Sequence, residues 1–84
     1  MTRPITVDGK PFSMVSLTVR RGSRLAGRTV GEIEGELDVS VVLLRRDSSS
    51  DPHPAASIVV AERDNVAVLG EPEQIGQVVG ASQK

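Results

Sequence analysis

Few residues in this chain have side chains that enzymes use as nucleophiles or metal ligands. The sequence has no cysteine, and His53 is its one histidine. A thiolate nucleophile and a cysteine-rich zinc site are therefore excluded, and a catalytic triad would depend on His53 alone. Of the three carboxylates Glu32, Glu34 and Glu36, only the first and last share a helix face, which favours a solvated surface over an acid-base or cation site. We expect no enzymatic activity, no cofactor and no metal.

Arginine is the abundant charged group. Eight of the ten basic residues are arginines, a side chain that binds carboxylates and phosphates through paired hydrogen bonds. Arg45 and Arg46 follow a hydrophobic run. We interpret a second group of arginines as a patch that faces solvent or a partner. This group comprises Arg20, Arg21, Arg24 and Arg28. The net charge is only −1, which argues against a nucleic-acid-binding protein.

The size and composition of the chain indicate one small domain with an aliphatic core. Its 84 residues are too few for two separate cores, and Phe12 is the single aromatic residue. Stacking platforms for single-stranded nucleic acid are therefore excluded. The longest aliphatic run, residues 41–44, is far shorter than the roughly 20 residues of a membrane helix. No apolar signal core follows Met1, so we expect a bacterial-type cytoplasmic domain.

Hydrophobic alternation predicts several short strands. Val15, Leu17 and Val19 alternate with polar residues, as in a half-buried strand. The run before Arg45 is rich in β-branched residues, and we place it at the centre of the sheet, buried on both faces. Serine and proline predict a loop over residues 47–54. The four strands are expected at residues 14–19, 39–46, 57–61 and 66–69.

Capping signals predict two short helices. Thr29 and Glu32 have the spacing of a capping box, and a helix starting there ends near Leu37. Pro72 is placed at the first turn of a last helix, which Gly80 is expected to end. The order strand, helix, strand, strand, strand, helix predicts an α+β fold with a small antiparallel sheet.

Three segments in this order resemble the C-terminal domain of RCK/TrkA potassium-transport regulators. Residues 17–33, LTVRRGSRLAGRTVGEI, are similar to its opening strand, Gly-Ser turn, Leu-Ala-Gly step and short helix. Residues 38–46, DVSVVLLRR, resemble its next strand, which commonly ends in a basic residue. Residues 64–73, DNVAVLGEPE, resemble its closing strand, glycine and helix start. The resemblance covers residues 14–80, nearly the whole globular part.

The flanks and one turn lie outside this pattern. We expect an N-terminal tail or lead-in over residues 1–13 and a C-terminal tail over residues 81–84. The family usually has Gly-Asp where this chain has Arg63 and Asp64, so we expect the turn to differ in geometry or to depend on Asn65. No G-x-G-x-x-G occurs, which excludes Rossmann-type binding of NAD or ATP. The chain is either a stand-alone regulator or a piece of a transporter or channel subunit.

The resemblance implies a homodimer that senses a small ligand in a potassium or other monovalent cation transport system. In some members the ligand is cyclic di-AMP, and a two-fold axis suits a symmetric dinucleotide. Carried over by position, the residues reaching this ligand are an apolar wall and three polar side chains: Val41, Val42, Leu43, Arg45, Arg46 and His53. Each has a simpler interpretation: core or dimer interface for the aliphatic residues, strand exit for the arginines, an exposed loop for His53.

A purely structural dimerisation module without a small-molecule ligand is the alternative. In both cases the expected partners are a second copy and a membrane cation transporter, antiporter or channel subunit, with no nucleic acid. The expected location is the cytoplasm, peripheral to the inner face of the membrane through the transporter. A ligand-dependent melting temperature would separate the two.

Overall fold

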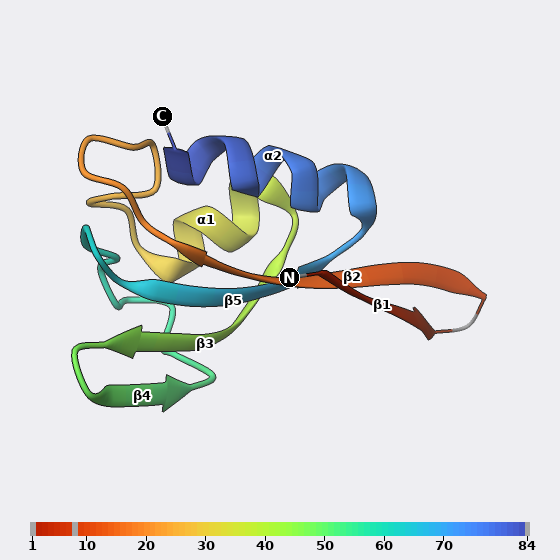
Figure 1. Ribbon diagram of the computed structural model, residues 1–84, viewed down its shortest axis with the longest axis horizontal. Helices are drawn as coiled ribbons and strands as arrows, with labels where there is room; N and C mark the ends of the chain where they lie inside the picture. The colour runs from red at the N-terminus through yellow and green to blue at the C-terminus, as the bar shows by residue number, and fades with distance from the viewer. Residues whose placement is uncertain (1, 8, 84) are drawn as a thin grey trace.

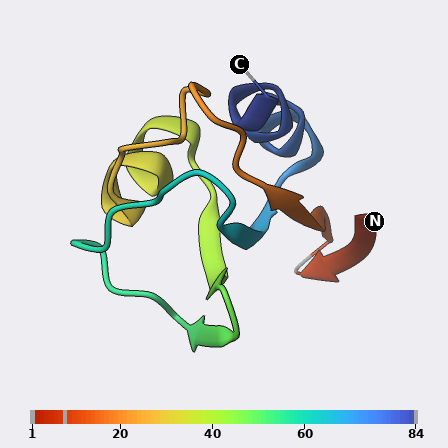
Figure 2. The same cartoon turned by 60° about the vertical axis from the view of Figure 1, so that its left-hand side comes forward.

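The computed structural model describes residues 2–7 and 9–83 as a five-stranded antiparallel sheet with two helices on one face (Figure 1). Across the sheet the strand order is β1-β2-β5-β3-β4. Figure 2 shows the two helices beside one another on the same side of the sheet. The predicted α+β class and antiparallel sheet are confirmed. The elements are β1 Thr2–Val7, β2 Lys10–Thr18, α1 Val30–Leu37, β3 Ser40–Arg46, β4 Ser49–Pro52, β5 Asn65–Gly70 and α2 Pro72–Gln83.

The prediction of a tail or lead-in before residue 14 was wrong, because β1 and the start of β2 form an antiparallel hairpin there. The two prolines that argued against strands are tolerated for a geometric reason. Pro4 lies opposite Ser13, whose backbone groups face β5, so the nitrogen of Pro4 faces the open edge. Pro11 lies before Ser13, the first residue of β2 that pairs with β5. No residue of β5 therefore lacks a hydrogen bond because Pro11 has no N–H.

The middle of the sheet also differs from the expectation. The central strand is β5, which lies between β2 and β3, whereas β3 lies one strand from the edge. The edge is β4, formed by residues that were expected in a loop. It pairs with β3 across a two-residue turn in which Asp47 has a φ of 55°. Local turn composition was thus overridden by the pairing that β3 offers.

Residues 57–61 were expected to be a strand of the sheet, which is wrong. They run beside the start of α1, with one isolated bridge between Val59 and Thr29. The N–H of Val60 donates to the carbonyl of Arg28, and the N–H of Val30 donates to the carbonyl of Ile58. Extended, β-branched residues are therefore used here to pair with a loop instead of a strand.

The two helices begin where the capping signals place them. The Thr29 hydroxyl accepts from the N–H of Glu32, whose carboxylate accepts from the N–H of Thr29, so the capping box is confirmed. Pro72 is the first residue of α2, as predicted. Gly80 does not end this helix, which continues to Gln83, so residues 81–83 are helical instead of a tail. Lys84 is outside the described residues.

The core lies between the helices and one face of the sheet. Ile33 of α1 and Val78 of α2 are buried against β-branched residues of the three inner strands. Each fully buried aliphatic side chain contributes roughly 1.5–3 kcal/mol. In the ranges 2–7 and 9–83, no helix is long and apolar enough to cross a membrane. The buried strand residues under the helices are Val15, Val41, Leu44, Val66 and Val68.

Candidate functional site

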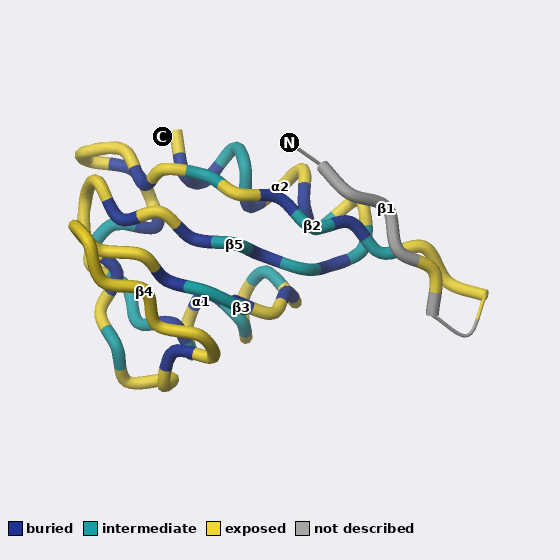
Figure 3. The backbone as a smooth tube through the Cα atoms, turned by 60° about the horizontal axis from the view of Figure 1, so that its bottom comes forward, coloured by how far each residue is buried: buried dark blue, intermediate teal, exposed yellow. Residues whose placement is uncertain are grey.

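The sheet has one face without helices, and the candidate site lies on it. Successive residues of a strand point to opposite faces, so the neighbours of the buried strand residues face away from the helices. Figure 3 views the sheet from this side and shows half-buried and exposed residues along β5 and β3. We call this surface the helix-free face. Its residues on strands β2 to β5 are Phe12, Met14, Ser16, Thr18, Ser40, Leu43, Arg45, Ser50, Pro52, Asn65, Ala67 and Leu69.

A depression of about 300 Å³ marks the middle of the helix-free face. Leu43 and Ala67 supply apolar surface and lie opposite one another on β3 and β5. Arg45 lies opposite Asn65 on the same pair of strands. The depression thus combines an apolar floor with a cationic and amide rim. Its lining residues are Ser16, Leu43, Arg45, Asn65, Val66 and Ala67.

A β-bulge decides which residues of β3 reach this face. Val41 pairs with Val68 and Leu43 pairs with Ala67, so Val42 is the extra residue between two register steps. The carboxylate of Glu34, on α1, accepts from the N–H of Val41 over 2.9 Å. Because of the bulge, Leu43 and Arg45 face outward, whereas Val41 and Leu44 are buried on the helix side.

The polar groups at the rim suit an anion with hydrogen-bond acceptors. The Thr18 hydroxyl donates to Oδ1 of Asn65 over 2.8 Å, which leaves the Asn65 NH₂ group to donate elsewhere. Among the residues that the structure describes, none forms an ion pair or hydrogen bond with the Arg45 side chain. An exposed guanidinium with five donors is a site for a carboxylate or phosphate.

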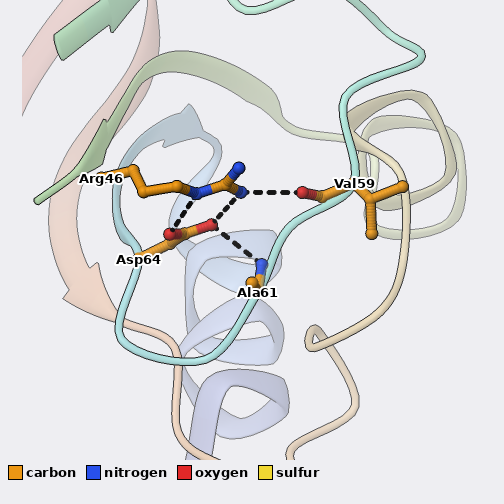
Figure 4. A network of polar contacts seen from close by, with 4 residues as sticks. All are labelled: Arg46, Val59, Ala61 and Asp64. Carbon is orange, nitrogen blue, oxygen red and sulfur yellow. Dashed lines mark hydrogen bonds and ion pairs between the residues drawn. The ribbon is translucent and has the colours of Figure 1, made fainter. Parts of the chain in front are cut away.

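Arg46, although adjacent, has a different environment (Figure 4). Its Nε and Nη2 donate to the two carboxylate oxygens of Asp64 over 2.9 and 2.7 Å, and Nη2 also donates to the carbonyl of Val59. Asp64 additionally accepts from the N–H of Ala61. The Arg46 hydrogen bonds, more than any other cause, hold the pKa of Asp64 below its usual range, against the opposing effect of burial. Arg46 therefore fastens β3 to the turn before β5.

The turn that contains Asp64 has a residue in the left-handed conformation, and this residue is not a glycine. Arg63 has a φ of 74°, so it adopts the conformation in which a glycine carries no steric penalty. The left-handed position is therefore Arg63, and the expectation that the turn would depend on Asn65 was wrong. Asn65 is the first residue of β5 and has an ordinary backbone conformation. The network around Asp64 holds the turn despite the cost at Arg63.

The structure brings only some of the sequence-predicted site residues together. Leu43 and Arg45 share the helix-free face. Val41 is 5% exposed and faces the helices, so it lies in the core. Val42 is half-buried at the bulge, and its carbonyl accepts from the N–H of His53, which follows β4 with an exposed side chain. Neither Val42 nor His53 lines the depression.

Sequence reasoning missed the residues contributed by the other strands. Ser16 and Thr18 come from β2, and Asn65 and Ala67 come from β5. No spacing along the chain connects them to Leu43, because antiparallel pairing alone makes them neighbours. The useful signal was the period of two in each strand, which assigns alternate residues to the face opposite the buried valines.

Comparisons with solved structures agree with this fold. The RCK_C domain dimer of BusR from S. agalactiae, in complex with c-di-AMP, matches with a TM-score of 0.73 and 14% identity over 83% of this chain and 89% of that chain. The RCK_C domain of the potassium transport protein KtrA, also in complex with c-di-AMP, matches with a TM-score of 0.66 and 16% identity over 80% and 79% of the two chains.

A larger protein with this fold is also among the matches. S. agalactiae BusR in complex with its busAB-promotor DNA has a TM-score of 0.73 and 14% identity over 83% of this chain, which corresponds to 35% of that chain. A search of curated proteins found no sequence match. The family model of the TrkA-C domain matches residues 14–80. This match spans most of the sequence, and the chain therefore belongs to the TrkA-C domain family.

Proposed function

We propose that this chain is a non-enzymatic regulatory domain that forms a homodimer and binds an anionic dinucleotide, cyclic di-AMP, between the two copies. The observation that carries the proposal is the position of Arg45. Its guanidinium has no ionic partner among the described residues and stands beside an apolar depression on the helix-free face. Two structural relatives, BusR and KtrA, are described in complex with c-di-AMP.

The helix-free face has the composition expected of a surface covered in a dimer. Phe12, Met14 and Leu69 are half-buried and extend the apolar floor beyond Leu43. A domain of this size buries only about 60% of its unfolded surface, so pairing adds apolar burial that one copy lacks. A two-fold axis through this face duplicates Arg45, and two guanidinium groups match the two phosphates of a symmetric dinucleotide.

Each predicted site residue has a role in this proposal. Leu43 and Arg45 contact the ligand directly, with Asn65 donating to an acceptor on it. Val42 and His53 form the margin of the site beside β4. Val41 and Arg46 act from the helix side, where burial and the Asp64 pair hold β3 in place. Ligand binding would then favour one arrangement of the two copies over another.

The family and the likeness to KtrA, a potassium transport protein, support a proposal for the biological setting. We propose that the dimer regulates a potassium or other monovalent cation transporter, antiporter or channel subunit on the cytoplasmic side of the membrane. Because the BusR chain bound to DNA is much longer than this chain, the expected absence of nucleic-acid contact is proposed only for these 84 residues.

Thermal unfolding with and without ligand tests the proposal. Cyclic di-AMP at 100 times its dissociation constant should add about 2.7 kcal/mol of stability, and each kcal/mol raises the melting temperature by about 4–8 °C in a domain of this size. Arg45→Ala should abolish the shift. Arg21→Ala removes another exposed arginine, which lies in a loop outside the depression, and should retain the shift. An unchanged melting temperature of the wild-type protein at millimolar ligand would contradict the proposal.

The alternative is a structural dimerisation module, and the continuous apolar strip from Phe12 to Leu43 favours it. Such a strip is sufficient to pair two sheets without a ligand. In that case the dimer would persist at every ligand concentration and melt at the same temperature. Arg45→Ala would then leave both dimerisation and melting unchanged.

A further inference from the structure

A groove lies on the other side of β2 from the proposed dinucleotide site, between the edge of this strand and α2. Its volume is about 460 Å³. Leu17 and Val79 are half-buried and form apolar walls. Its lining contains no carboxylate. The lining residues are Val15, Ser16, Leu17, Thr18, Arg20, Val79, Ser82 and Gln83.

The backbone of β2 is exposed along this groove. Val19 donates its N–H to the carbonyl of Asp64 and accepts from the N–H of Arg63, so both of its backbone groups face β5. Backbone groups alternate in direction along a strand, so the N–H and C=O of Thr18 face the groove. No backbone hydrogen bond joins Thr18 to a described residue on that side. Among the described residues, this part of β2 is therefore a strand edge without a backbone partner.

Neighbouring elements limit this edge at both ends. The described part of β1 ends at Thr2, opposite Val15, and Figure 1 shows β1 beside only part of β2. Beyond Thr18, the last turn of α2 closes the edge, because Arg20 donates its N–H to the carbonyl of Ser82. An added strand would therefore continue the line of β1 and stop at the C-terminus of α2.

The charge around the groove selects the kind of segment that would fit. Arg20 lies on its rim, and Arg21 and Arg24 are exposed in the following loop. Arg24 is attached to the same end of α2 through the bond of its N–H to the carbonyl of Ala81. Among the described residues, none of these three arginines forms an ion pair. In a segment bound along the groove, a carboxylate beyond the apolar walls would lie close to these three arginines.

We infer that the groove binds an extended acidic segment of a partner protein by strand addition. The backbone of the segment pairs with Thr18, an apolar side chain lies between Leu17 and Val79, and a carboxylate binds Arg20. Strand addition uses main-chain hydrogen bonds for affinity and alternate side chains for specificity. Ser16 lines both sites and Thr18 is bonded to Asn65, but Leu17, Val79 and Arg20 line only the groove and Arg45 lines only the depression. Variants of Arg20 and Arg45 therefore separate the two kinds of binding.

Two blocked eight-residue peptides test the inference by fluorescence anisotropy, one alternating valine with glutamate and the other valine with lysine. We expect the glutamate peptide to bind at least about tenfold more tightly, with the difference reduced at high salt. Thr18→Pro removes the N–H from the edge, and Arg20→Glu reverses the charge while keeping its backbone bond to Ser82. Each should weaken binding about tenfold or more, whereas Arg45→Glu should retain it while losing the response to cyclic di-AMP.

Amide hydrogen exchange locates the bound peptide. The glutamate peptide should protect the amide of Thr18 in the wild-type protein and in Arg45→Glu. Equal binding of the two peptides, or no loss of binding in both Thr18→Pro and Arg20→Glu, would overturn the inference. Protection of the Thr18 amide that rises with protein concentration in the absence of peptide would also overturn it, because a second copy would then occupy the edge.

Discussion

Replacing Asp64 by asparagine should destabilise this domain strongly. The Asp64 side chain is 3% exposed and accepts three hydrogen bonds, two from Arg46 and one from the N–H of Ala61. Asparagine keeps the shape but replaces one acceptor oxygen with a donor, which faces other donors. Hydrogen bonds to charged groups contribute about 1.5–3 kcal/mol each. Water can hydrate the half-exposed Arg46 in the variant, which offsets part of this cost. We therefore expect the free energy of unfolding to fall by about 2–4 kcal/mol.

Urea unfolding at pH 7 and fixed protein concentration measures this loss. Asp51→Asn is the matched control, because Asp51 is exposed on β4 and should change stability by less than about 0.5 kcal/mol. Arg46→Met and the double variant complete a thermodynamic cycle, in which the double variant should lose less stability than the sum of the two single variants. If Asp64→Asn costs no more than Asp51→Asn, the network is a surface ion pair and the reasoning fails.

The same network predicts a dependence of stability on pH. The hydrogen bonds from Arg46 depress the pKa of Asp64 in the folded state. Its contribution to the free energy of unfolding is therefore complete above the unfolded value of about 3.9 and is lost as the pH falls through the lower folded value. Arg46→Met should make this acid-dependent loss smaller, because the hydrogen bonds that lower the pKa of Asp64 in the folded state are gone. Identical acid-unfolding profiles for the wild-type protein and Arg46→Met would contradict the assignment.

Three further substitutions test how the fold is held. Arg63→Gly should raise stability by about 0.5–1 kcal/mol in urea unfolding, because glycine adopts the φ of 74° without a Cβ penalty; a loss would show that the Arg63 side chain contributes more. Gly70→Ala should cost about 1–3 kcal/mol, since its Cβ would lie 2.9 Å from Cγ1 of the buried Val39; an unchanged melting temperature would exclude tight packing there. Thr29→Ala should cost about 1 kcal/mol through the lost capping box with Glu32, and unchanged helicity by circular dichroism would argue against that bond.

The sequence was sufficient for the elements whose local signals agree with their packing. The Thr29 capping box and the first-turn Pro72 place both helix starts. Alternation predicts the second half of β2, and the hydrophobic residues 66–69 predict β5. The hairpin of β1 had a signal that was outweighed by its prolines: Asp8 and Gly9 are a typical hairpin pair. Pro4 is tolerated because its nitrogen faces the open edge of the sheet. The order of the strands decides which backbone groups face that edge, and the local sequence does not determine this order.

The candidate site was predicted only along one strand. The resemblance indicated β3 and its basic end, and Leu43 and Arg45 do share the helix-free face. It did not separate Arg45 from Arg46, because the bulge at Val42 decides which of them faces the helices. Asn65 and Thr18 reach the site because β2, β5 and β3 pair side by side. Asp64 binds Arg46 and keeps its guanidinium at the turn. These are tertiary consequences that spacing does not report.

Calorimetric titration of cyclic di-AMP, combined with sedimentation, tests the central claim most directly, namely that two copies share one dinucleotide across the helix-free face. We predict one ligand bound per two chains, a dimer at every ligand concentration used, and at least a tenfold loss of affinity in Arg45→Ala, roughly the loss of one charged hydrogen bond. Absence of binding heat at millimolar ligand, or one ligand bound by each monomeric chain, would contradict the account.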